Sequence, residues 1–119
     1  MAEYGFKKSH RILKRREFLA LADNGKVCHS RNFLGVFQKP CKNNTGRLGI
    51  TVSKKVGNAV DRNRIKRLVR EYWRTRSLSE KLIVDVNIIA KKHCADQSST
   101  ELFKSLFILF KKIQGELDG

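Results

Sequence analysis

Two segments of the chain repeat apolar residues at the spacing of helices that are buried along one face. Over residues 59–76 the apolar side chains fall at i, i+3, i+4, i+7 and i+8. The other segment follows Ser98, which with Glu101 has the spacing of a capping box. A shorter helix is expected over residues 14–24, with Gly25 as its C-terminal stop. The apolar positions of the two longer helices are Ile65, Leu68, Val69, Tyr72 and Trp73, and Leu102, Leu106, Leu109, Phe110 and Ile113.

Four further segments read as β-strands, at residues 26–31, 33–39, 47–53 and 82–92. The turn-forming sequence between the second and third strands, KPCKNNTG, predicts that these two strands form a hairpin with a long loop. The predicted order of elements is αβββαβα, which favours an α+β sandwich with helices packed on one sheet. The length of 119 residues allows one domain, residues 1–119.

The composition points to an anionic macromolecule as the partner. The chain has 26 Lys and Arg but only 11 Asp and Glu, which gives a formal net charge of +15. Self-repulsion of this size destabilises a small domain unless a polyanion neutralises it, so nucleic acid is the leading partner and an anionic membrane surface is the rival. Hydrophobic residues make up 40% of the chain, which argues against a disordered basic tail.

The positive charge is confined to the first two thirds of the chain. The net charge is +5 over residues 1–31, +3 over 32–53, +7 over 54–76 and zero over 77–119. A charge that served solubility alone would have no reason to stop at residue 76, whereas a binding surface would. The distribution therefore predicts an RNA-binding domain whose surface includes the helix over 59–76.

The remaining composition favours a cytoplasmic protein. No apolar run approaches the ~20 residues that span a bilayer, and the first residues lack the apolar stretch of a secretory signal. Cys28, Cys41 and Cys94 are odd in number and far apart, which is typical of reduced thiols in a cytosol. We therefore expect a soluble cytoplasmic protein that binds no membrane, and we predict no stable protein partner.

The predicted helix over 59–76 carries a cationic face opposite its apolar stripe. That face holds Asn63, Lys66, Arg67, Arg70 and Arg74, with Arg62 and Arg64 flanking the stripe. Cations spaced four residues apart repel one another, and an anionic partner would remove this penalty. Arginine, which outnumbers lysine here, suits phosphate oxygens and stacks on bases. The alternative is a solvated face held by Asp61 and Glu71, but two acids cannot neutralise the nine bases of residues 54–76.

The same segment carries a resemblance to a known family. The sequence from Thr51 to Arg74, TVSKKVGNAVDRNRIKRLVREYWR, resembles the signature of the bacterial ribonuclease P protein. Arg62-Asn63-Arg64 stands where that family has its Arg-Asn-Arg motif. The resemblance covers about residues 7–113, the expected core of the domain, through KKSHRILKRREF, FLGVF, RLGITVSKKVGNAV, IIAKK and KSLFILFKK. A run of this length and order is far more specific than a short motif.

The resemblance implies both a function and a fold. Members of the family assemble with a catalytic RNA that removes the 5′ leader of precursor tRNA in a Mg²⁺-dependent endonucleolytic cut. The RNA is the catalyst and binds most of the Mg²⁺, and the protein is an accessory subunit that can broaden the substrate range to other small structured RNAs. The family fold, shared with the second domain of a small-subunit ribosomal protein, is α+β with a left-handed βαβ crossover. Connection rules alone would favour a right-handed one.

The resemblance also implies two sites on the protein. The motif helix and the residues before it are expected to contact the catalytic RNA through Lys54, Lys55, Arg62, Asn63, Arg64, Lys66, Arg67 and Arg70. A cleft between the first helix and the sheet is expected to hold the leader through Arg11, Lys14, Arg15, Arg16, Phe18 and Phe33. Such a cleft makes physical sense, because single strands stack on aromatic side chains beside cations.

The aromatic part of the leader cleft is open to alternatives. Phe33 is equally compatible with an ordinary core position, since most strand aromatics simply pack. Ala22 and Val36 stand where the family often has aromatic residues, so stacking here is expected to be weaker or to involve Phe37 or Phe107.

The sequence offers no catalytic group of the protein's own. A metal-dependent nuclease needs several converging carboxylates, and Asp85 is the one acid on a predicted strand, where we expect it to face solvent or cap. His10, His29 and His93 have no acid–base partner at motif spacing, and the cysteines lack the spacing of a zinc site. The rival hypotheses are a ribosomal-type RNA-binding protein, a self-sufficient nuclease and a basic membrane-surface protein.

Overall fold

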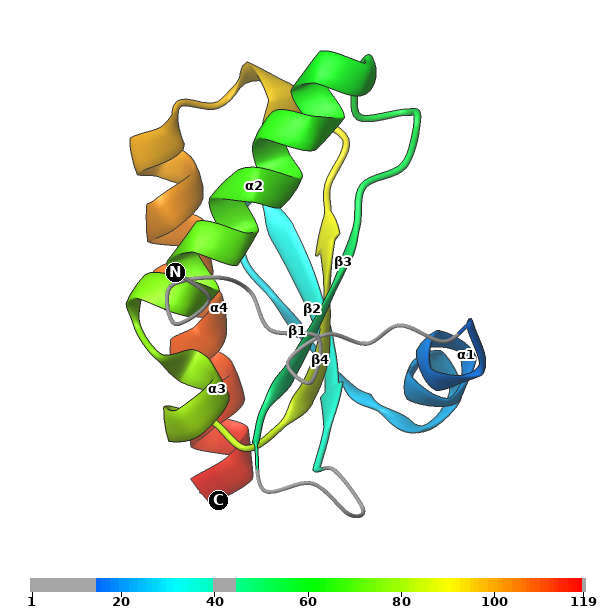
Figure 1. The fold of residues 1–119 in the computed structure, drawn as a ribbon, viewed down its shortest axis with the longest axis vertical. Coiled ribbons are helices and arrows are strands. Elements are labelled where there is room, and N and C mark those ends of the chain that lie inside the picture. The colour runs from blue at the N-terminus through cyan, green and yellow to red at the C-terminus, as the bar shows by residue number, and fades with distance from the viewer. Residues whose placement is uncertain (1–14, 40–44, 119) are drawn as a thin grey trace, which may run out of the picture.

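A four-stranded mixed sheet with helices on both faces forms the frame of the protein (Figure 1). The computed structural model describes residues 15–39 and 45–118. Its elements in chain order are α1 (Arg15–Asn24), β1 (Lys26–His29), β2 (Phe33–Gln38), β3 (Arg47–Thr51), α2 (Ala59–Thr75), α3 (Leu78–Lys81), β4 (Asp85–Ala90), the 3₁₀ turn η3 (Cys94–Asp96) and α4 (Ser99–Asp118). The predicted sequence of helices and strands is confirmed, with α3 and η3 added.

The strand order is β1-β2-β4-β3, so the predicted hairpin between the second and third strands is wrong. β2 pairs antiparallel with β1 and β4, and β3 pairs parallel with β4 in the register Leu48↔Val86. The turn formers between β2 and β3 indicate a chain reversal but do not specify the pairing partner. β4 lies between β2 and β3, and four of its six residues, Asp85, Val86, Ile88 and Ala90, are buried there.

The parallel pair β3 and β4 requires a crossover connection, which α2 provides. The predicted strand–helix–strand unit is therefore present, and the left hand implied by the resemblance stays a prediction. The strands are shorter than expected, since the last predicted strand begins at Asp85 rather than at residue 82. The short helix α3 occupies part of the preceding connection, and Ser77 before it has a positive φ of 51°.

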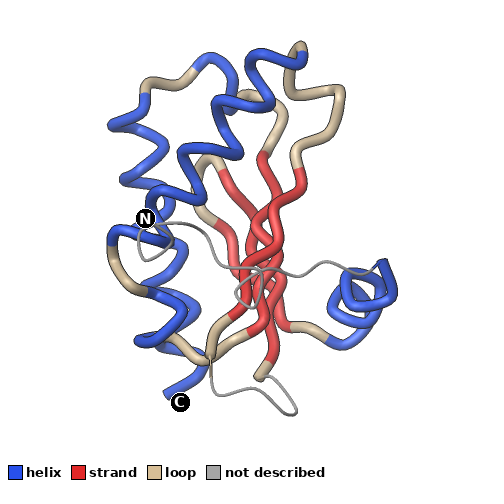
Figure 2. Tube along the Cα trace, in the orientation of Figure 1, coloured by secondary structure: helices blue, strands red, loops and turns tan. Residues whose placement is uncertain are grey.

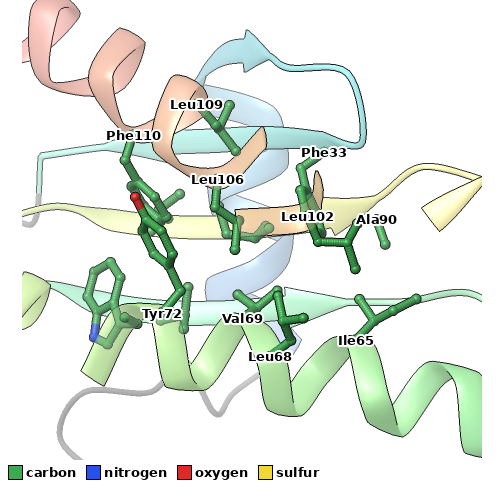
Figure 3. Close-up of a cluster of buried hydrophobic side chains, with 14 of the residues drawn as sticks. Phe33, Ile65, Leu68, Val69, Tyr72, Ala90, Leu102, Leu106, Leu109 and Phe110 are labelled. Carbon is green, nitrogen blue, oxygen red and sulfur yellow. The ribbon is translucent and has the colours of Figure 1, made fainter. Parts of the chain in front are cut away.

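Helices α2 and α4 cover one face of the sheet and bury the main core. Figures 1 and 2 show the two helices on the same side of the strands. The stripes predicted for both helices are buried and meet above the sheet (Figure 3). Tyr72 of α2 stacks on Phe110 of α4 with ring centroids 5.7 Å apart. This packing turns the opposite side of α2 outward.

Helix α1 lies on the other face of the sheet (Figure 1). Its contact there is a small apolar cluster in which Leu21 and Val36 are buried, with Phe18, Leu34 and Ile89 packed around them. The two faces follow from strand alternation, since Phe33 and Phe37 of β2 join the main core while Leu34 and Val36 point to α1. The sheet thus separates α1 from α2.

Candidate nucleic-acid interface

The N-terminus of α2 is fixed by its cap. The Asn58 side-chain oxygen accepts a hydrogen bond from the Asp61 backbone N–H at 2.9 Å, and Asn58 has the extended backbone of an N-cap. Gly57 lies so close to Asp61 that a Cβ at Gly57 would come within 2.7 Å of a carboxylate oxygen. The helix therefore begins at Ala59, and its register sets which side chains face the core and which face outward.

The outward face of α2 and the loop before it carry an array of cations without acidic partners in the described residues. Lys54, Lys55, Asn63, Arg67 and Arg70 are exposed, and Arg62, Arg64 and Lys66 are half-buried. Within residues 15–39 and 45–118, no ion pair joins a cation of this set to a carboxylate. The structure therefore does not show a face neutralised by Asp61 and Glu71. The cationic groups of this set are not occupied by carboxylates of these ranges and can bind phosphates.

One member of the set, Arg64, has a structural contact that sequence reasoning missed. Its Nη2 donates a hydrogen bond to the backbone carbonyl of Gln97 at 2.9 Å, which connects α2 to the segment after η3. The neighbouring Arg62 has a buried Nε with no hydrogen-bond partner in the described parts of the chain. Of the two arginines of the motif, Arg64 is thus held by the fold, whereas Asn63 between them is exposed.

A groove of about 580 Å³ lies between α1 and the sheet. The sheet supplies Thr51 and Asn87, and the Thr51 hydroxyl donates a hydrogen bond to the Asn87 side-chain oxygen at 3.0 Å. The α1 side supplies Arg15, Phe18, Leu19 and Ala22. This is the place at which the sequence predicted a leader cleft.

The structure brings together only part of the predicted leader set. Arg15 and Phe18 line the groove, and Arg16 is exposed on the same helix. Arg11 and Lys14 lie outside the described residues. Phe33 is fully buried in the core under α4, so its assignment as a leader-binding residue is wrong. Strand alternation points its ring to the face of the sheet away from α1.

The alternative aromatic residues do not fill the groove. Phe37 is buried in the same core as Phe33, and Phe107 is exposed on α4 across the sheet from α1. Val36 faces α1 but is buried against Leu21, while the small Ala22 lines the groove and leaves it open. Phe18 is therefore the aromatic side chain that lines the groove in the described residues.

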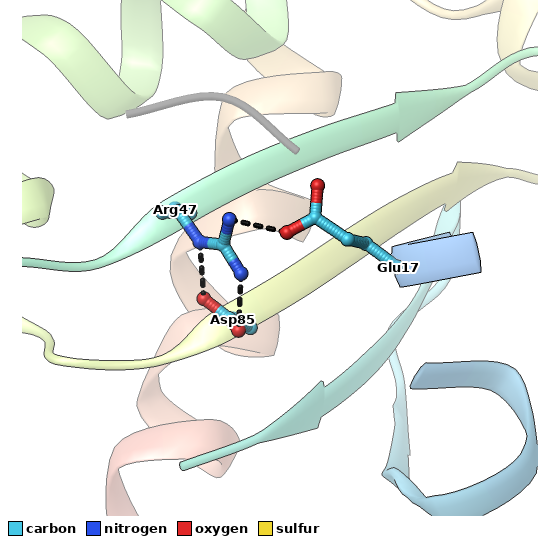
Figure 4. A network of polar contacts seen from close by, with 3 residues as sticks. All are labelled: Glu17, Arg47 and Asp85. Atoms are coloured by element: carbon cyan, nitrogen blue, oxygen red, sulfur yellow. Dashed lines mark hydrogen bonds and ion pairs between the residues drawn. The ribbon is translucent and has the colours of Figure 1, made fainter. Parts of the chain in front are cut away.

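Beside the groove, one arginine joins two acids from different elements (Figure 4). Arg47 of β3 donates from Nε and Nη2 to the two carboxylate oxygens of Asp85, at 3.0 and 2.9 Å, and from Nη1 to Glu17 of α1 at 2.5 Å. These hydrogen bonds raise the pKa of the Arg47 guanidinium, with Asp85 the largest cause, although burial opposes them. The expectation that Asp85 faces solvent or caps is wrong, because it is buried and paired with Arg47.

Two further features limit what these surfaces can do. No group of three or more His, Cys, Asp and Glu side chains that could hold a metal ion occurs in the described ranges. Among the helices of the same ranges, none is long and apolar enough to cross a membrane.

Comparison with known proteins gives a consistent result. The family model described as Ribonuclease P matches residues 6–114. The ribonuclease P protein component of Desulfatibacillum aliphaticivorans is 47% identical over 113 residues, which are 95% of each chain. That of Desulforapulum autotrophicum is 46% identical over 113 residues, 95% of this chain and 96% of its own.

A solved structure supports the same assignment at the level of the fold. The RNase P protein of Staphylococcus aureus, solved at 2.0 Å, superposes with a TM-score of 0.84 at 34% identity and covers 89% of this chain and 96% of its own. The family match, the relatives and the shared fold agree with the motif on α2. The chain belongs to the ribonuclease P protein family.

Proposed function

We propose that the cationic face of α2 binds the catalytic RNA of ribonuclease P while the groove under α1 binds the 5′ leader of precursor tRNA. The observation that supports the proposal is the placement of α2, with its cationic face, and of the groove under α1 on opposite faces of one sheet (Figure 1). A rigid sheet between them holds the leader at a fixed position relative to the RNA. The protein thereby acts as an accessory subunit that positions substrate for RNA-catalysed cleavage.

The α2 face has the chemistry expected for a folded RNA. Its cations are distributed along the helix and the loop before it, and they have no acidic partners in the described chain. Such a surface neutralises phosphates, and its affinity falls steeply with salt. The residues proposed for this contact are Lys54, Lys55, Arg62, Asn63, Arg64, Lys66, Arg67 and Arg70.

The groove has the chemistry expected for a single strand. The half-buried ring of Phe18 offers a stacking surface, Arg15 is a cation at the same groove, and Thr51 and Asn87 supply polar groups. Arg15, Arg16 and Phe18 are the proposed leader-binding residues among those described. Because Ala22 adds no second ring, we expect the leader to be held by one stacking contact and by its phosphates.

The protein is proposed to assist Mg²⁺ chemistry without holding the metal. Asp85, the acid that sequence reasoning considered, is paired with Arg47, so its oxygens are already used. Hydrolysis would then depend on Mg²⁺ bound mainly by the RNA subunit. Neutralising RNA phosphates with the protein's cations lowers the Mg²⁺ that the complex requires. A cytoplasmic location belongs to the same proposal.

The test is 5′ cleavage of a precursor tRNA at low millimolar Mg²⁺. Three reactions contain the protein alone, a bacterial ribonuclease P RNA alone, or both. We expect efficient cleavage in the combined reaction and none with the protein alone. Cleavage by the protein alone would reveal an active site of its own, and no gain from adding protein to a competent RNA would contradict the accessory role.

The assignment of α2 is tested separately by binding. Arg67→Ala and Arg70→Ala are each expected to lower the slope of log affinity against log salt by about 1, because each removes one phosphate contact. Lys81→Ala, which removes an exposed cation of α3, is the matched control and should leave the slope unchanged. Equal slopes for all three variants would exclude Arg67 and Arg70 from the interface.

A further inference from the structure

We propose that Arg47 is a positioning residue, which holds the first turn of α1 against the sheet and so sets the shape of the groove. The proposal rests on the leader-binding role proposed for that groove. Glu17 and Phe18 are consecutive on α1, and Arg47 and Gly49 lie on one face of β3. The Glu17 carboxylate meets Arg47, and the Phe18 ring lies against Gly49.

The contacts of Arg47 suit a bridge between two elements. Its Nε and Nη2 are both directed to Asp85, which fixes the plane of the guanidinium and leaves Nη1 pointing to Glu17 (Figure 4). The three side chains are only 20%, 25% and 10% exposed for Arg47, Glu17 and Asp85, so solvent screens the pairs weakly. A planar fork of this kind gives directional contacts that a lysine ammonium does not.

The two ends of α1 are held differently. Near the C-terminal end, Leu21 is buried against Val36. The first turns carry Arg15 and Phe18, two of the α1 residues that line the groove, and there the charged contact of Glu17 adds to the apolar packing of the partly exposed Phe18. Loss of that contact therefore loosens the part of α1 that faces the leader, while Leu21 keeps the helix on the sheet.

This arrangement predicts a specific kinetic effect. If Arg47 served stability alone, removing its contact to α1 would affect assembly and all substrates equally. If it positions the groove, the loss is confined to substrates whose leader reaches the groove. The readout is the KM of the reconstituted holoenzyme for a precursor with a long leader compared with one that has a single leader nucleotide.

The first variant is Glu17→Gln, which removes the charge and keeps the size of the side chain. We expect the KM for the long-leader precursor to rise about fivefold, which corresponds to about 1 kcal/mol, the typical net value of one hydrogen bond, with kcat and the short-leader KM unchanged. Glu116→Gln is the matched control, since it makes the same change in net charge at the exposed Lys26–Glu116 pair, 4.0 Å apart. Glu116 does not line this groove.

Two more variants test the geometry. Arg47→Lys keeps the charge but loses the fork, and we expect it to share the KM increase. Glu17→Asp keeps the carboxylate and should recover part of the loss. Amide hydrogen exchange of the free protein gives an independent readout, with faster exchange expected in residues 18–21 of Glu17→Gln than in the wild type and no change at Gly25, whose N–H donates to the Leu21 carbonyl.

The outcomes of these experiments distinguish a failure of the positioning role of Arg47 from a failure of the leader-binding function proposed for the groove. Equal KM values for Glu17→Gln and Glu116→Gln, or an equal rise for both leader lengths, would overturn the role of Arg47. Phe18→Ala serves as the reference for the groove itself. If Phe18→Ala raises the long-leader KM and Glu17→Gln does not, only the positioning role fails. If neither raises it, the groove is not the leader site.

Discussion

The ring of Phe18 lies directly against the backbone of Gly49. A Cβ built on Gly49 would come within 2.7 Å of the Phe18 Cε1 and 2.9 Å of its Cζ, closer than real side chains approach. The absence of a side chain at this position of β3 is therefore what lets an aromatic residue of α1 lie against the sheet. The contact joins the groove to the strand that leads into α2.

Gly49→Ala should displace the Phe18 ring and weaken leader binding. We expect a higher KM for a long-leader precursor, with little change in affinity for the catalytic RNA, because α2 packs on the other face of the sheet. Gly115→Ala is the control, since nothing lies within 4 Å of its Cβ position in α4. That substitution should stabilise the helix by about 0.5–1 kcal/mol. Unchanged leader discrimination in Gly49→Ala would contradict the contact.

Phe18→Ala and Phe33→Ala should have opposite effects on the stability of the protein and on leader binding. Phe33 is fully buried under α4, so its truncation is expected to cost about 3–5 kcal/mol of unfolding free energy. Phe18 is half-buried in the groove, so its truncation should cost far less stability and should raise the long-leader KM. Urea denaturation and cleavage kinetics on the same preparations check both. A stable Phe33→Ala protein with impaired leader binding would restore the original assignment of Phe33.

Arg64→Ala should weaken assembly with the catalytic RNA while the domain stays folded. The hydrogen bond that Arg64 donates to the Gln97 carbonyl is lost, which is expected to cost about 1 kcal/mol of unfolding free energy. A filter-binding titration measures the RNA affinity, and thermal denaturation measures the stability. If RNA affinity is unchanged, Arg64 is a structural residue and leaves the interface.

Stability should fall at alkaline pH because of Cys94. Burial raises the pKa of its thiol from 9.0 to about 11, so the folded state holds the proton at pH values where the unfolded chain releases it. The free energy of unfolding is therefore constant below pH 9 and declines between pH 9 and 11, by about 2 kcal/mol in total from this group. Urea denaturation across this range measures the decline.

The control for the alkaline decline is Cys94→Ala. This variant loses the hydrogen bond from the thiol to the Asn32 carbonyl and is less stable throughout, but its decline should be shallower than that of the wild type. Cys28 and Tyr72 also have pKa values raised by burial, and they account for the part that remains. An identical pH dependence in both proteins would show that folding does not raise the pKa of Cys94.

The helices could be predicted because the residues that specify them are close together in the sequence. The apolar repeats of α2 and α4 predicted both the elements and the buried residues, and Asn58 and Ser98 act as capping residues, with each side chain accepting a backbone N–H. The cationic face of α2 followed from the same periodicity. The position of Phe18 in a groove under α1 was likewise expected from the resemblance and agrees with the structure.

The pairing of strands could not be predicted in the same way. β3 reads as a half-buried strand whether its neighbour is β2 or β4, since alternation fixes the faces of a strand but not its partner. The placement of Phe33 could not be predicted for a similar reason. The alternation of β2 separates its residues into two faces, but it does not say which face packs against α4 and which against α1. Asp85 was misjudged for a related reason: its partner Arg47 lies 38 residues away in the sequence.

The position of β4 in the sheet also governs how the protein is made. β4 pairs with both β2 and β3, so the sheet cannot extend beyond the β1–β2 hairpin until β4, which ends at Ala90, has been synthesised. By then the whole of the basic helix α2 has been translated, because it ends at Thr75. A strongly cationic segment is therefore synthesised, on a ribosome that itself consists largely of RNA, before the strand that completes the sheet exists. Folding of this chain begins in the presence of a polyanion.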